Sequence, residues 1–280
     1  MMAPMLLFVL SIPPTTPRAA SYFGGTIVMV GLSKEELVIA ADSRNIIQGR
    51  PDDSACKIVA LGHRLIFTAA GMAGEGDPAH PIWSATDEAR RAFGLTQSDS
   101  STDGKTEVVK TAEVWAAAIS QDLKSAIKRS PTIITGFFEN LILIGIFGGL
   151  DRIDQPEFAA VTLTYNRLAS QPEEPVIDWT INEYKFTGPG GVVLQPYGDV
   201  DVFKEIEAGQ TERAKIESVE RQRIIDSHDP RAVETITIRA AEKTIAFSTD
   251  GKVGGEVDAV SLRASSGVRW IRRKTNCPAN

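Results

Sequence analysis

The side chains that most often do chemistry in proteins are scarce in this sequence and stand far apart. The histidines are His63, His80 and His228, and the cysteines, Cys56 and Cys277, lie towards opposite ends of the chain with no CxxC motif. These spacings exclude a disulfide framework and a structural zinc site. HExxH, Walker A, GxGxxG and GxSxG motifs are also missing, so several common enzyme chemistries are excluded. We expect neither a cofactor nor a metal.

The composition is that of a soluble globular protein. The chain has 280 residues, of which 42% are hydrophobic and 24% charged, and this balance excludes collagen-like, disordered and polytopic membrane chains. The net charge is −6 and the isoelectric point about 5.3, which argues against nucleic acid as a partner.

The first 25 residues form a leader with two interpretations. An apolar run from Met5 to Ile12, a Pro-Pro break and the small residues Ala19 and Ala20 resemble a secretory signal peptide, although no Lys or Arg precedes the run. The run spans about 12 Å as a helix, against about 30 Å for a bilayer core, so we expect no stable membrane anchor. The alternative is a propeptide. The chain would be exported in the first case and cytoplasmic in the second.

The remainder, residues 26–280, reads as strands alternating with pairs of helices. Hydrophobic runs predict strands at 26–30, 37–41, 57–61, 65–70, 141–147, 159–165, 176–187, 257–262 and 268–272. Helical periodicity and start signals predict helices from Asp77-Pro78 to Ala92, from Val108 to Ile127, within 200–226 with a break near Gly209, and from Asp229-Pro230 to Phe247.

This order of elements predicts the fold class. Two packed sheets with helices on their outer faces satisfy it, which is an α+β protein with a four-layer α/β/β/α sandwich. No internal repeat and no linker interrupts residues 26–280, so we expect a single domain after the leader.

Three stretches carry specific motifs. They are GTIVMVGLSKEELVIAADSR, ACKIVALGHRLIFTAAGMAGE and AVETITIRAAEKTIAFSTDGKVGGEVDAVSL. They resemble proteasome β-type subunits and their bacterial relatives among the N-terminal nucleophile (Ntn) hydrolases, over residues 25 to about 273. The resemblance implies the Ntn type of sandwich, a peptide or amide substrate and a homo-oligomeric ring.

The resemblance also implies a nucleophile at Thr26. A threonine hydroxyl needs an adjacent base, and in this class the base is the threonine's own α-amino group, with a reference pKa of about 7.7–8.0. That amine exists only after the preceding peptide bond is cut. Gly25 supplies the small residue needed for autocleavage at Gly25-Thr26. Such a site needs neither imidazole nor thiol, in keeping with the scarcity of His and Cys.

Four further residues match the family's site. Lys57 stands where a buried lysine lowers the pKa of the hydroxyl, and Asp42, sixteen residues after Thr26, would hold that lysine by an ion pair. Gly71 matches the glycine whose N–H forms the oxyanion hole. Asp250 matches the acidic residue near the amine. An ion pair of purely structural value is the alternative interpretation of Asp42 and Lys57.

Two hydroxyls that the family places beside the nucleophile are missing. Pro189 stands in the place of one serine and Val253 in the place of the other. Their loss slows the reaction or marks an inactive subunit. Near the nucleophile, Ala69 and Ala73 predict a roomy pocket where Glu75 is the only fixed charge, which favours a neutral, apolar side chain at the cleavage position.

Three functions therefore stay open. The first is a threonine-type peptidase or amidohydrolase made by autocleavage. The second is a non-catalytic structural subunit of a proteasome-like ring, which the missing serines favour. The third is a small-molecule amidase on the same fold, monomeric or dimeric.

Overall fold

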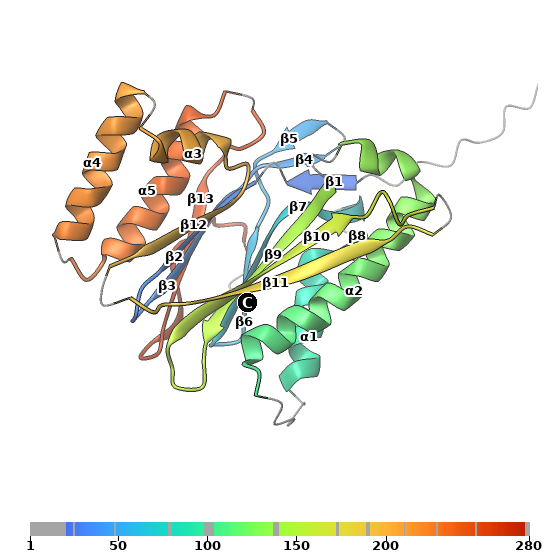
Figure 1. Ribbon diagram of the computed structural model, residues 1–280, viewed down its shortest axis with the longest axis horizontal. Helices are drawn as coiled ribbons and strands as arrows, with labels where there is room; N and C mark the ends of the chain where they lie inside the picture. The colour runs from blue at the N-terminus through green and yellow to red at the C-terminus, as the bar shows by residue number, and fades with distance from the viewer. Residues whose placement is uncertain are drawn as a thin grey trace, which may run out of the picture.

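The chain folds into a mixed α/β structure with two antiparallel sheets (Figure 1). The computed structural model describes residues 21–277, apart from 25, 48, 78–79, 98–103, 137–139, 172–173, 189–190, 210, 228 and 250. The leader residues 1–20 and the predicted site residues Gly25 and Asp250, as well as Pro189, therefore lie outside the described residues.

The larger sheet has nine strands. They are β1 (Ser21–Gly24), β4 (Asn45–Ile47), β5 (Arg50–Asp52), β6 (Ile58–Leu61), β7 (Leu65–Asp77), β8 (His80–Ser84), β9 (Leu141–Leu150), β10 (Pro156–Tyr165) and β11 (Ile177–Lys185). The long strand β7 organises the sheet, because β1, β6, β8 and β9 all pair with it.

The smaller sheet has five strands in the order β12-β2-β3-β13-β14. They are β2 (Ile27–Leu32), β3 (Leu37–Asp42), β12 (Val193–Gly198), β13 (Val257–Arg263) and β14 (Gly267–Arg272). Every residue of β2 and β3 is buried, as expected for central strands covered on both faces.

Helices cover the outer face of each sheet. They are α1 (Ala85–Gln97), α2 (Glu107–Arg129), α3 (Asp201–Glu207), α4 (Glu212–Asp226) and α5 (Ala232–Phe247), with a 3₁₀ turn at Pro131–Gly136. One apolar cluster joins α1 and α2 to the larger sheet, and another joins α3 and α5 to the smaller sheet. A third lies between the sheets, where Val28 and Ile39 meet Ile66 and Ile146. These contacts place the described residues in the predicted α+β class.

The predicted helix start at Asp77-Pro78 is wrong. The chain continues in strand β7 to Asp77 and turns back as β8, and α1 begins only at Ala85. Ser84 accepts a hydrogen bond from the backbone N–H of Asp87 at 3.0 Å, and its hydroxyl donates to the Asp87 carboxylate at 2.8 Å. This cap ends the strand and starts the helix about two turns later than the periodicity indicated.

The exclusion of disulfides also needs correction. Cys56 and Cys277 form a disulfide, with their Cα atoms 5.5 Å apart and 221 positions apart in sequence. Cys56 lies two residues before β6, and Cys277 follows β14 on a segment that returns to the same place. Distance along the chain says nothing about distance in space, which is why the spacing misled.

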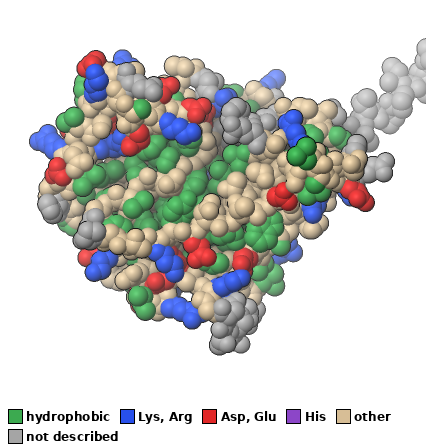
Figure 2. All heavy atoms as spheres, viewed as in Figure 1, with side chains coloured by type: hydrophobic (Ala, Val, Ile, Leu, Met, Phe, Trp, Pro, Cys, Tyr) green, Lys and Arg blue, Asp and Glu red, His purple; other side chains and the backbone are tan. Residues whose placement is uncertain are grey.

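One face of the molecule carries an apolar region. Figure 2 shows hydrophobic side chains gathering in the middle of this face, with charged side chains around them. Val193 on β12 and Trp179 on β11 are among the large hydrophobic residues that are exposed. No helix in the described part of the chain has the length and apolar character needed to cross a membrane.

Candidate active site

Thr26, Asp42 and Lys57 come together where strands of the two sheets end. Thr26 directly precedes β2 and Asp42 is the last residue of β3, and the antiparallel pairing of these strands brings the two residues to the same edge. Lys57 directly precedes β6 and reaches them from the larger sheet. The structure thus assembles three of the predicted site residues that can be described.

The Lys57 ammonium lies between the hydroxyl and the carboxylate. Its Nζ donates a hydrogen bond to Thr26 Oγ1 at 2.6 Å and to Asp42 Oδ1 at 2.9 Å, and a third to the carbonyl oxygen of Arg44. Because an ammonium has three donors, these partners use all of them. The cation is therefore fixed with one proton directed at the threonine oxygen.

Backbone donors hold the Asp42 carboxylate in place. The N–H of Ile27 donates to Oδ1 at 3.2 Å and the N–H of Gly254 to Oδ2 at 3.0 Å. Each carboxylate oxygen thus has a backbone donor, and one of them comes from the residue after Thr26. Asp42 consequently orients Lys57 and the start of β2 together.

The three residues are almost completely buried, with exposed fractions of 2% for Thr26, 0% for Asp42 and 9% for Lys57. Burial lowers the pKa of the Lys57 ammonium, although the charge of Asp42 opposes this. Burial likewise raises the pKa of the Asp42 carboxyl, opposed by Lys57 and the two backbone donors. Perturbed pKa values in a cleft are typical of functional sites.

Gly71 occupies a position that only glycine fits. Its φ is +109°, and a Cβ there would lie 2.4 Å from the carbonyl oxygen of Ile142. It stands on β7 between Ala69 and Ala73, both of which line the cavity beside Thr26. Its role as an oxyanion donor stays a prediction.

Arg44 ties down the chain at Gly251 and Val253. The guanidinium donates to the carbonyl oxygens of Gly251 at 3.1 Å and Val253 at 3.4 Å, and forms an ion pair with Asp53. Val253, which stands where a serine was expected, is buried in the apolar cluster against the smaller sheet. Its side chain brings no hydroxyl to the site.

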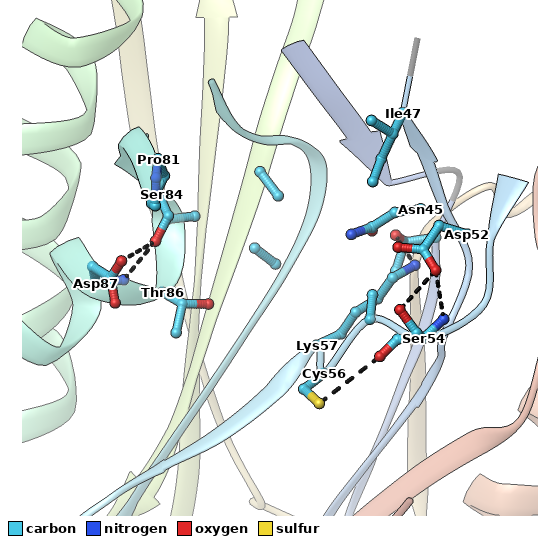
Figure 3. Close-up of a pocket in the computed structure, with 15 residues that line it drawn as sticks. Asn45, Ile47, Asp52, Ser54, Cys56, Lys57, Pro81, Ser84, Thr86 and Asp87 are labelled. Atoms are coloured by element: carbon cyan, nitrogen blue, oxygen red, sulfur yellow. Dashed lines mark hydrogen bonds between the residues drawn. The ribbon is translucent and has the colours of Figure 1, made fainter. Parts of the chain in front are cut away.

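A cavity of about 440 Å³ opens beside Thr26 (Figure 3). Ala69 and Ala73 leave it roomy, as expected. Figure 3 shows two walls that face each other, one formed by Pro81, Ser84, Thr86 and Asp87 and the other by Asn45, Ile47, Asp52, Ser54, Cys56 and Lys57.

The charges in this cavity differ from those predicted. Glu75 is absent from the described lining, because its carboxylate accepts hydrogen bonds from Trp83 and Arg129 instead. Asp52 and Asp87 line it and were missed. No local pattern marks these two residues, since β5 and α1 bring them to the cavity only in the folded chain.

Strand β1, which consists of residues 21–24, lies beside this cavity. In β1, Gly24 pairs with Gly71 of β7, and on its other side Phe23 pairs with Ile46 of β4. Both pairings are antiparallel. Strand β1, the last described part of the leader, therefore lies between β7 and β4 and pairs with both. This is how an extended peptide adds to a sheet.

Comparison with models of known families finds no match, and neither does comparison with curated proteins. Among solved structures, the chain is similar to one described as "Anbu (Gly-1) mutant" from Hyphomicrobium sp. strain MC1. The TM-score is 0.47 and the identity 16%, over 92% of this chain and 88% of that one. Because this likeness is weak, the function has to be judged from the chain's own residues.

Proposed function

We propose that this protein is a proteasome-like, N-terminal-threonine peptidase or amidohydrolase of the Ntn type, with the four-layer α/β/β/α sandwich of that superfamily. The observation that carries the proposal is the Lys57 ammonium, which lies 2.6 Å from Thr26 Oγ1 and 2.9 Å from Asp42 Oδ1 in a buried site. A buried cation directed at a hydroxyl lowers the hydroxyl's pKa, which is what a threonine nucleophile needs.

The proposed mechanism begins with cleavage at Gly25-Thr26. Hydrolysis of that bond releases residues 1–25 and leaves a free amine on Thr26, which accepts the hydroxyl proton as Oγ1 attacks a substrate carbonyl. Lys57 stabilises the developing oxyanion of Thr26, and the N–H of Gly71 receives the negative charge on the tetrahedral intermediate. Asp250 is proposed to orient the amine. The leaving amine departs with the transferred proton, and water then hydrolyses the acyl ester.

Strand β1 supports a peptide as the substrate. Before cleavage the leader pairs with β7 and β4 ahead of Thr26, and its departure frees that place for another extended chain. The carboxylate of Asp52 in the adjacent cavity favours a basic side chain there, whereas Asp87 is already paired with Arg90 at 2.9 Å. This replaces the earlier expectation of a neutral, apolar side chain.

The Cys56–Cys277 disulfide supports export of the protein. Disulfides persist in oxidising compartments and are rare in the cytosol. The leader would then act as a signal peptide, as a propeptide or as both in turn.

A non-catalytic, proteasome-like subunit is the second candidate. Val253 favours it, because this buried residue offers no hydroxyl where the family has a serine. Such a subunit would form a ring without reacting at Thr26, and light scattering after size-exclusion chromatography would show its mass.

Intact-mass analysis of the purified protein tests the proposal. We expect a mature chain that begins at Thr26 and gains one equivalent of a threonine-directed electrophile such as an epoxyketone. The Thr26→Ala variant should retain residues before position 26 and bind no electrophile. The Thr26→Ser variant should retain part of the reactivity towards the electrophile. A wild-type chain that keeps Gly25-Thr26 intact would contradict the proposal.

A further inference from the structure

We propose that residues 274–277, here called the C-terminal clamp, position the loop that carries Lys57, so that Lys274, Asn276 and Cys277 are positioning residues for the active site. The loop consists of residues 54–57, here called the Lys57 loop. The expected effect of the clamp on catalysis rests on the proposed function, whereas its effect on the position of the Lys57 loop does not.

The clamp holds three consecutive residues of the Lys57 loop. Cys277 is bonded to Cys56, the Nζ of Lys274 donates to the carbonyl oxygen of Ala55, and Asn276 Nδ2 donates to the carbonyl oxygen of Ser54 at 3.2 Å. Two hydrogen bonds and one covalent bond therefore fix the backbone immediately before the lysine.

The clamp is itself anchored to the sheet that bears Thr26 and Asp42. Asp258 on β13 accepts a hydrogen bond from the backbone N–H of Lys274 at 2.9 Å and forms an ion pair with its Nζ at 3.5 Å. Asp258 is buried, and β13 pairs with β3 up to Asp42. The clamp thus ties the Lys57 loop to the sheet that carries its two catalytic partners.

The Lys57 loop needs this support because it belongs to no strand. Residues 54–57 lie between β5 and β6, and Ser54 is exposed. All four residues line the cavity. One side of the loop therefore forms the wall where substrate is proposed to bind, and the clamp holds it by its carbonyl oxygens and by Cys56. A shift of this backbone would move Nζ away from Thr26 Oγ1.

The clamp also keeps Lys57 buried. The charged groups that act on its ammonium are Asp42 from β3, Asp53 directly after β5 and Lys274 from the clamp itself, and Asp52 of β5 lines the same cavity. Releasing the clamp would admit water to Lys57 and move the positive charge of Lys274 away from it. Both changes raise the pKa of Lys57 back towards its ordinary value.

Reduction of the folded, mature protein tests the clamp. A dithiol such as dithiothreitol converts the disulfide into two thiols and becomes a cyclic disulfide itself, and iodoacetamide then blocks the thiols. We expect epoxyketone labelling to slow by roughly 10- to 100-fold, because a displacement of about 1 Å can cost that much. The labelling rate falls at high pH as Lys57 loses its proton, and the pH of this fall should increase. Hydrogen exchange should accelerate across residues 54–57, with far-ultraviolet circular dichroism unchanged.

Matched variants separate the clamp from general destabilisation. Cys56→Ala/Cys277→Ala should reproduce the reduced state and be insensitive to dithiothreitol, and Asn276→Ala should give a smaller effect. Arg239→Gln breaks a distant ion pair with Glu217 and should leave labelling and exchange at 54–57 unchanged. The clamp is refuted if reduction leaves both the exchange at 54–57 and the pH dependence of Lys57 acetylation unchanged. These two readouts need no catalysis, so they decide on the clamp even if the wild type is never labelled.

Discussion

Two buried carboxylates on neighbouring sheets have acquired different tasks. Asp42 is paired with Lys57, whose side chain is only 6% exposed, and that lysine also contacts the Thr26 hydroxyl. Glu75 is just as deeply buried, but its cation, Arg129, has a side chain that is 43% exposed and contacts no candidate nucleophile among the described partners. Trp83 Nε1 completes the Glu75 site with a bond of 3.2 Å.

The difference lies in the cation rather than in the acid. A cation at the surface is hydrated, so it neutralises a buried carboxylate and joins α2 to β7 without a large desolvation cost. A cation buried with its partner carries that cost, and its remaining protons must find acceptors. In this protein one of those acceptors is a threonine oxygen, which is why we propose a catalytic role for the Asp42 pair and a structural role for the Glu75 pair.

Substituting the two cations should give the largest contrast. Lys57→Met should slow epoxyketone labelling of Thr26 by about 10²–10³-fold, because a preorganised donor at the reacting oxygen is lost. In the Arg129→Met variant, Thr26 should be labelled at close to the wild-type rate, since Glu75 keeps its hydrogen bond from Trp83. Labelling rates from intact mass measure both. Equal losses in the two variants would remove the distinction between the pairs.

Substituting the two acids should separate the pairs by stability. Asp42→Asn leaves the buried Lys57 without a counter-charge and should lower the free energy of unfolding by about 3–5 kcal/mol. Glu75→Gln leaves a hydrated Arg129 and should lower it by about 1–3 kcal/mol. Urea denaturation at pH 7, followed by circular dichroism, measures both values. A larger loss for Glu75→Gln would reverse the assignment.

The pH dependence of labelling should reveal the buried cation. The rate should rise as the Thr26 amine loses its proton near its reference pKa of about 7.7–8.0, and fall as Lys57 loses its charge. Because burial lowers the pKa of Lys57, the fall should begin below the ordinary lysine value of about 10.4. Arg129→Met should leave both limbs in place. A profile that stays flat up to the ordinary lysine range would argue against a buried, charged Lys57.

A third carboxylate, Asp52, should give the smallest effect. It is half-buried in the cavity wall, and both of its hydrogen bonds from Ser54 reach Oδ1, so we expect Oδ2 to receive a basic substrate side chain. Asp52→Asn should reduce the preference for peptides with Lys or Arg at the cleavage position by up to about fivefold, in line with an exposed ion pair of 0.2–1 kcal/mol. Competition between basic and leucine-containing fluorogenic peptides measures the ratio. An unchanged ratio would assign the preference elsewhere.

The sequence predicted the parts of the fold that depend on local patterns. The hairpin of β2 and β3, that of β6 and β7 and the closing hairpin of β13 and β14 stand where continuous apolar runs flank short polar turns. Helices α2, α3 and α4 agree with their periodicity, including the break near Gly209. Strands β1, β4, β5, β8 and β12 escaped prediction, because three to six residues carry too little pattern, and β8 was taken for a helical turn.

For the site, the sequence determined which residues are available, and the tertiary structure decided how they meet. The fixed register of one hairpin brings Thr26 close to Asp42, whereas Lys57 comes from the other sheet and was matched through the resemblance to proteasome β-type subunits. The disulfide, the carboxylates of the cavity and the strand that precedes Thr26 depend on contacts between segments far apart in sequence. Such contacts are set by how the sheets, helices and C-terminal segment pack together, and no local pattern records that packing.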